Sequence, residues 1–330
     1  MKNIRTLIVG MATLAIFVST ANAQKLLRWK FVPGENIQVN FQQDMKMSTD
    51  MMGNQIKTTA DMGMTLGWQV RTVSPQGVAE IAQSIERLQM NMSNPGSAPI
   101  AYDSTATTEP TGVAAQLATG IDSLVGVEVL QQLNPRGEIL DVKLSPQAQA
   151  QAAKAPAAAQ VQQVFSKEGM KALLHQAATV LPEQPVNTGD SWTSQMDTKS
   201  PVGSLHMDMK YTYRGTEVYN GRQLEVIDVS VNVGFGAEPN PLGLKVKVAE
   251  QEGKGALFFD AAAGRFVSTQ LNQSMSLETT VGKTVHRQQL ETVVKMQFAN
   301  RSGSPSNRPA TATAAPQSAV QPASAAQPVR

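Results

Sequence analysis

Histidine and cysteine, which are common in active sites, are scarce in this 330-residue sequence. The three histidines, His175, His206 and His286, fall on three different predicted elements, and the sequence has no cysteine. It also has no nucleophile elbow, P-loop, His-Glu-x-x-His or dinucleotide fingerprint. His206 and His286 are predicted on polar strand faces, where a histidine usually meets solvent or a hydrogen-bond partner. We therefore expect a protein that is not an enzyme and has no catalytic residue and no cofactor.

Methionine is the other residue type with a possible chemistry. The Met-x-Met motif occurs at residues 45–47, 62–64, 90–92 and 207–209. In a strand both thioethers of such a pair lie on one face, and thioethers bind Cu(I). Each pair, however, stands where the alternation already requires an apolar residue, and His206 points to the face opposite Met207. We expect no metal site, and Cu(I) binding through these pairs is the weakest of three functional alternatives.

The two ends of the sequence differ from its middle. Residues 1–23 have a basic start, an apolar run over residues 7–18 and a terminal Ala-Asn-Ala, which is the layout of a cleavable signal peptide. We expect an exported protein, periplasmic or extracellular, with no transmembrane span after cleavage. Residues 302–330 consist mainly of Pro, Ala, Ser, Thr and Gln, which predicts a disordered tail.

The middle of the sequence is long enough for one large domain. We expect a β-rich domain over residues 24–301, either as one unit or as two similar halves, 24–145 and 186–301, joined by a helical segment, 146–185. Loss of the signal peptide removes Lys2 and Arg5, so the formal net charge falls from +2 to zero. Such a balance does not favour nucleic acid as a partner.

A first hairpin is predicted around Gly53-Asn54. A two-residue turn there sets Met45 against Met62 on a nearly apolar face. On the opposite face it sets Lys46 against Asp61, an attractive cross-strand pair.

A second hairpin of the same design is predicted around Gly282-Lys283. It sets Met275 against Leu290 on the apolar face and Glu278 against Arg287 on the other. Elsewhere the alternation changes phase, which predicts β-bulges at Arg214-Gly215, at Val226-Ile227 and between Ile85 and Leu88.

Several of the predicted strands run for about 15 residues, or about 50 Å, and strands that long must twist and curl. The expected fold class is α+β and mostly antiparallel β. Its centre is a long curled sheet, like an open half-barrel, with two or three helices on or near the concave face. Helices are expected at residues 113–125 and 161–181, and a hairpin between them at residues 127–133 and 138–144.

The methionine-rich strand faces are expected to line this concave side. Methionine is flexible and suits apolar surfaces that adapt to varied partners. The candidate cavity residues are Met45, Met47, Met62, Met64, Trp68, Met207, Met209 and Tyr211. Two interpretations remain open at this point, since the face is either a cavity for an apolar ligand or a core filled by the two helices.

Four short motifs together resemble an uncharacterised family of secreted, β-rich bacterial proteins, a domain of unknown function. The motifs are Phe31-Val32-Pro33-Gly34-Glu35, Tyr102-Asp103-Ser104, Gly189-Asp190-Ser191-Trp192 and Gly264-Arg265-Phe266-Val267-Ser268. The resemblance implies a location outside the cytoplasm, but it implies no activity and no catalytic residue. The expected architecture is also similar to that of periplasmic lipoprotein carriers, which bind acyl chains on a concave face.

These observations predict an exported, non-catalytic protein that binds an apolar ligand or lipid on its methionine-lined face. The alternative is a structural or assembly module of the cell envelope that binds another envelope protein.

Overall fold

The computed structural model describes residues 24–51, 54–122, 124–146, 148–150, 179–200, 203–236, 245–281 and 284–300. The predicted signal peptide and tail lie outside these residues, as does most of the helical segment predicted at 161–181.

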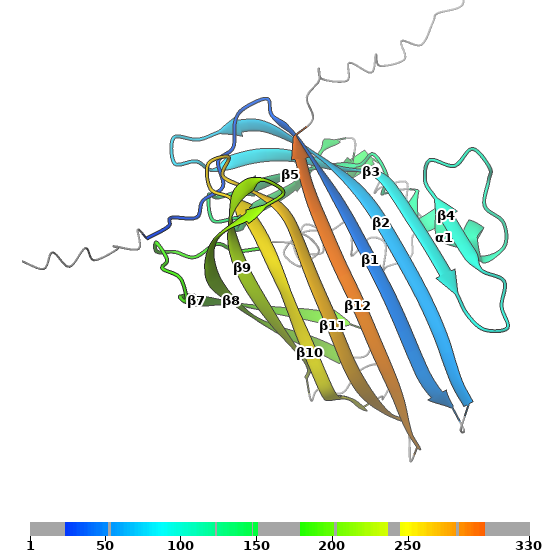
Figure 1. The fold of residues 1–330 in the computed structure, drawn as a ribbon. Coiled ribbons are helices and arrows are strands. Elements are labelled where there is room, and N and C mark those ends of the chain that lie inside the picture. The colour runs from blue at the N-terminus through cyan, green and yellow to red at the C-terminus, as the bar shows by residue number, and fades with distance from the viewer. Residues whose placement is uncertain are drawn as a thin grey trace, which may run out of the picture.

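Within the described residues, twelve strands form one antiparallel sheet (Figure 1). The strands are β1 Asn36–Met51, β2 Asn54–Val73, β3 Ala79–Ser93, β4 Ile100–Asp103, β5 Glu128–Leu133, β6 Ile139–Leu144, β7 Ser191–Ser200, β8 Gly203–Tyr219, β9 Arg222–Phe235, β10 Lys245–Asp260, β11 Arg265–Val281 and β12 Thr284–Asn300. Their order across the sheet is β6-β5-β3-β2-β1-β12-β11-β10-β9-β8-β7, and β4 pairs with β3. The first and last long strands, β1 and β12, are therefore neighbours in its middle.

The described residues are mostly β, so the expectation of an α+β fold was too helical. The single helix named among them is α1, Val113–Ile121, where a helix to Val125 was predicted. It ends early because Val125 forms a parallel β-bridge with Ile85, which requires an extended backbone. The hairpin predicted after this helix is confirmed as β5 and β6.

The predicted partners across β1 and β2 are wrong, although the predicted faces are right. Met45 lies opposite Ala60, not Met62, because the register of the two strands pairs Met51 with Asn54. The shift is two residues, and a two-residue shift leaves every side chain on its face. Lys46 is instead directly opposite Glu291 of β12, a neighbour that the hairpin alone could not reveal.

The second predicted hairpin is confirmed in register. Met275 lies opposite Leu290, and Glu278 lies opposite Arg287. The Arg287 Nε atom is 3.1 Å from Glu278 Oε1, so the predicted charge pair is formed.

Two register shifts confirm the predicted changes of phase. In β3 the shift puts a bulge at Glu86, between Ile85 and Arg87, which lie opposite successive residues of β2. In β8 it puts a bulge at Arg214, opposite the junction of Val226 and Ile227 in β9. One bulge therefore accounts for both phase changes predicted in β8 and β9.

The packed core lies at one end of the sheet and joins its two halves. Buried Val70, Ile81 and Val129 come from β2, β3 and β5, and they share one cluster with residues of β8 to β11. This cluster includes Tyr211, Tyr213, Ile227, Leu257, Phe259 and Phe266. Strands far apart in the sheet order meet there, so the sheet curls around one face.

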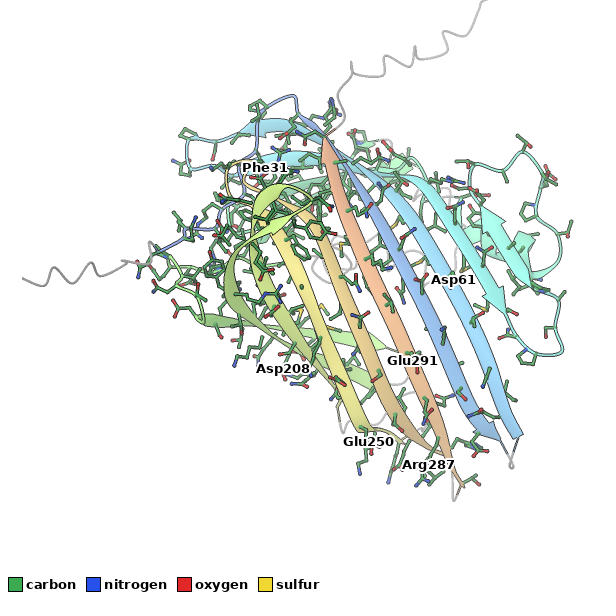
Figure 2. The ribbon with its side chains drawn as sticks, viewed as in Figure 1. Phe31, Asp61, Asp208, Glu250, Arg287 and Glu291 are labelled. Atoms are coloured by element: carbon green, nitrogen blue, oxygen red, sulfur yellow. The ribbon has the colours of Figure 1, made fainter. Side chains whose placement is uncertain are left out.

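The segment before β1 completes this core. Trp29 stacks on Phe31 with ring centroids 5.4 Å apart, and it meets the rings of Phe266 and Phe298 at 5.5 and 6.0 Å. Figure 2 shows Phe31 at this end and Arg287 at the opposite end of the long strands.

Two of the motifs in the proposed family resemblance meet in space at the core. Glu35 and Arg265 form an ion pair in which both side chains are largely buried, although 230 residues separate them. Lys30 also donates its backbone N–H to the Gly264 carbonyl at 2.8 Å. These two motifs therefore hold the N-terminal segment against β11.

Candidate functional site

One face of the sheet, which we call the inner face, is continuous across nine strands. A single transverse row of directly opposed residues defines it: Tyr211, Val229, Gly255, Leu271, Val294, Gln43, Met62, Met90 and Tyr102. Side chains opposed in an antiparallel ladder share a face. All but one member of this row are apolar residues or glycine, so an apolar surface crosses the sheet.

Every candidate cavity residue predicted from the sequence lies on the inner face. The registers place Met45, Met47, Met62, Met64 and Trp68 there on β1 and β2. They place Met207, Met209 and Tyr211 there on β8. Five strands separate β2 from β8 in the sheet order, so the two groups share a face without being adjacent.

The predicted list of cavity residues omitted several methionines of the same face. These are Met90, Met92, Met196, Met275 and Met296. Met90 lies directly opposite Met62, and Met196 lies opposite Met207. The Met-x-Met spacing at 90–92 was the signal that could have identified the first two. The strand registers put all methionines of the described strands on the inner face.

The inner face changes in exposure along the strands. At the core end of β1, Val39 is 2% exposed. Tyr211, another residue of the core, is also 2% exposed, and burial raises the pKa of its hydroxyl to about 12. Met45, Met47 and Met62, nearer the hairpin ends, are only half-buried. One end of the apolar surface is therefore part of the packed core, whereas the methionine end remains partly accessible.

Helix α1 covers part of the inner face beside β3 and β4. Its buried Ala118 packs in a small cluster with Leu88 and Tyr102, against which Met64 also packs. The Tyr102 hydroxyl donates a hydrogen bond to Asp122 just beyond the helix, and burial together with this bond raises the pKa of Tyr102.

A small cavity lies where the core meets the methionine end. Its volume is about 80 Å³, and its wall includes Trp29, Leu66, Trp68, Gln131, Met296 and Phe298. Leu66 and Met64 are successive inner positions of β2, so the cavity wall continues directly into the methionine surface.

Polar side chains, mainly glutamines and threonines, interrupt the inner face at several positions. The side-chain amide of Gln251 takes the place of backbone hydrogen bonds between β9 and β10. Its Oε1 accepts a hydrogen bond from the Val233 N–H at 2.7 Å, and its Nε2 donates one to the Val233 carbonyl at 2.9 Å. Gln273 lies in the row of Met45, and its Nε2 atom is buried without a partner among the described residues. Amides of this face thus have polar as well as apolar neighbours, since Thr292 lies directly opposite Gln273.

The two histidines among the described residues, His206 and His286, lie on opposite faces of the sheet. His206 lies on the outer face, as predicted, with Nδ1 2.6 Å from Asp197 and Nε2 3.2 Å from Asp208. The hydrogen bond to Asp197, with the charge of Asp208, raises the pKa of His206. His286 was wrongly predicted on a polar face, because its register opposite Thr279 puts it on the side of Leu290. His175 lies outside the described residues.

Charged residues occupy the outer face. Figure 2 shows Asp61, Glu291 and Arg287 spread along the long strands. The alternation thus separates a charged surface from the methionine surface within the same strands. Among the described residues, no helix has the length and apolarity needed to cross a membrane.

Several solved structures show a distant likeness to this chain. Lipovitellin, from a structure titled for its lipid–protein interactions, is 12% identical with a TM-score of 0.48, over 87% of this chain and 27% of lipovitellin. An outer membrane channel from Pseudomonas putida F1 is 9% identical with a TM-score of 0.23, over 82% of this chain and 97% of the channel.

A putative outer membrane lipoprotein-sorting protein domain from Vibrio parahaemolyticus is 11% identical with a TM-score of 0.14, over 81% of this chain and 88% of that domain. These TM-scores are too low to establish a shared function. This chain spans about a quarter of lipovitellin.

No curated protein sequence matches the chain. Two of the four motifs quoted above, at 102–104 and 189–192, fall inside a segment that matches a sequence family. The predicted resemblance to a family of unknown function is confirmed there, since residues 76–221 match the family of unknown function DUF6263.

Proposed function

We propose that this protein is exported, is not an enzyme, and binds an elongated apolar ligand, such as the acyl chain of a lipid, along its inner face. The observation that carries the proposal is that the methionines of the described strands all lie on the inner face, and that those at the hairpin end are partly exposed. A packed core would bury these side chains, as it buries Tyr211 and Phe266.

The chemistry of the surface fits a ligand of variable shape. Methionine side chains are unbranched and polarizable, so they adapt to different chain lengths and kinks at little cost. Along β2, Leu66 and Thr58 are eight residues apart, which is a distance of about 26 Å at ~3.3 Å per residue. An extended acyl chain fits along such a surface, whereas a compact polar ligand would leave it uncovered.

Native mass spectrometry of the gently purified mature protein tests the proposal. We expect an added mass that disappears after extraction with organic solvent and returns when a long-chain lipid is added back. A clean mass of the chain alone, which does not change on lipid addition, would contradict it and support the envelope assembly module.

A pair of variants at neighbouring positions locates the ligand. Met45→Lys puts a charge on the inner face and is expected to abolish lipid binding. Asp44→Lys puts the same residue on the exposed outer face and is expected to leave binding unchanged. Equal binding by both variants would exclude the inner face as the site.

A further inference from the structure

We infer that the indole N–H of Trp68 binds the polar end of the ligand, and that this end is an uncharged group bearing an oxygen acceptor. The inference rests on the proposed function and adds to it the chemical class and the orientation of the ligand.

The first observation is a buried donor without a partner on a residue that lines the cavity of about 80 Å³. Trp68 lines this cavity, and its Nε1 atom is inaccessible to solvent without a hydrogen-bond partner in the part of the chain that the structure describes. By comparison, the Trp192 indole donates to the Val180 carbonyl at 2.9 Å. A buried unpaired donor costs free energy, so a ligand acceptor placed there gains a hydrogen bond that the free protein lacks.

The second observation is the absence of positive charge around this donor. The described residues of the cavity wall include no lysine, arginine or histidine. The two glutamines of the wall contact each other, since Gln131 Nε2 donates to Gln83 Oε1 at 2.9 Å. A carboxylate or phosphate in this cavity would lose its water without an opposing charge, at a large cost. Moving an alcohol or ester oxygen out of water costs far less free energy, so the cavity selects a neutral hydrogen-bond acceptor.

The third observation is the size of the cavity and its connection. A dry cavity of ~150 Å³ accommodates a benzene molecule, so about half that volume takes only the end of a chain. Leu66 of the cavity wall is followed along β2 by Met64 and Met62 on the same face. The polar end therefore lies at the core, and the alkyl chain extends over the methionines toward the hairpin ends.

A competition experiment tests the inference with the mature protein. Equimolar 1-dodecanol and 1-chlorododecane are added to delipidated protein, and native mass spectrometry gives the ratio of the two complexes. The ligands match in chain length, but only the alcohol carries an oxygen acceptor. We expect Trp68→Phe to shift this ratio about fivefold to tenfold away from the alcohol, the value of one hydrogen bond to a buried donor. The control Trp192→Phe should leave the ratio unchanged.

The outcomes separate this inference from the proposed function. If both ligands bind and Trp68→Phe leaves their ratio unchanged, the role of Trp68 is wrong and the apolar site stands. If neither ligand binds, the proposed function fails as well.

A measurement on the unmodified sequence covers the case in which Trp68→Phe does not fold. The chain has 3 tryptophans, so ¹⁵N-labelled indoles give few signals. We expect 1-dodecanol to move one indole N–H signal downfield and 1-chlorododecane to leave it in place. The same response to both ligands would overturn the inference.

Discussion

Asp44 of β1 and Asp61 of β2 lie directly opposite each other on the exposed outer face. Like charges at opposed positions destabilise a strand pair. We expect Asp61→Asn to raise the free energy of unfolding by about 0.2–1 kcal/mol in low salt, and the gain to shrink as salt screens the repulsion. Urea midpoints at two salt concentrations measure it. A loss of stability would mean that Asp61 has an attractive partner that outweighs Asp44.

Substitutions at two adjacent positions test the facing of β2. Met62 lies on the inner face between Gln43 and Met90, so Met62→Asp forces a carboxylate among apolar side chains and should cost about 1–3 kcal/mol. Asp61→Met removes the repulsion with Asp44 and should cost nothing. Urea unfolding of the two variants side by side gives the difference. Equal losses would contradict the burial of the methionine face.

Glu225 should control stability in acid. It is 4% exposed, accepts hydrogen bonds from Tyr213 and Thr216, and pairs with Lys25 at 3.1 Å. Burial raises the pKa of Glu225, but these contacts outweigh burial and the pKa lies below its usual value. The ionised carboxylate therefore stabilises the fold above the unfolded pKa of about 4.3, and this contribution is lost as the pH falls through the lower folded pKa.

The variant Glu225→Gln keeps the shape but loses the charge. We expect it to cost about 1–3 kcal/mol at pH 7 and to flatten the decline of stability below pH ~4. Thermal unfolding of both proteins across this pH range measures the effect. Parallel stability curves at all pH values would show that another group controls the acid transition.

The ion pair of Glu35 and Arg265 should matter more than an exposed pair. Both side chains are largely buried, and Arg265 also contacts Asn300. Arg265→Met leaves the carboxylate buried without its cation, so we expect a loss of about 3–5 kcal/mol.

The control for this variant is Arg287→Met, which breaks the pair with Glu278. Arg287 is 74% exposed and Glu278 is 28% exposed, so its loss should cost at most about 1 kcal/mol. Adding Glu35→Gln to Arg265→Met should restore part of the lost stability. Equal costs for the two single arginine variants, measured by urea unfolding, would contradict the burial argument.

The sequence predicted which face of the sheet a residue occupies better than it predicted which residue lies opposite on the next strand. Strict alternation placed Met45 and Met62 on one surface, and the structure confirms that face. Their direct pairing was wrong because alternation does not distinguish two registers that differ by two residues. The pairing of Lys46 with Glu291 joins strands from the two ends of the chain, which no local pattern reveals.

The candidate site could be predicted only in part for the same reason. Its eight predicted residues all share the inner face, but the cavity at Trp68 depends on Trp29, Phe266 and Phe298 meeting across the curled sheet. Such contacts are set by how far the sheet curls. The expectation of a second helix on or near the concave side stays a prediction for residues 161–178, which the structure does not describe.

The position of a bound chain relative to the methionine methyl groups tests the central claim most directly. The mature protein is labelled with ¹³C at these methyl groups, and an acyl alcohol carrying a nitroxide at mid-chain is added at one equivalent. We expect selective broadening of the Met45, Met62 and Met90 signals, assigned by single Met→Leu variants, because the nitroxide would lie over the inner face. The same nitroxide without an alkyl chain should broaden none of them selectively. If the acyl nitroxide leaves these three signals as sharp as the control does, no apolar ligand lies along the inner face and the account is contradicted.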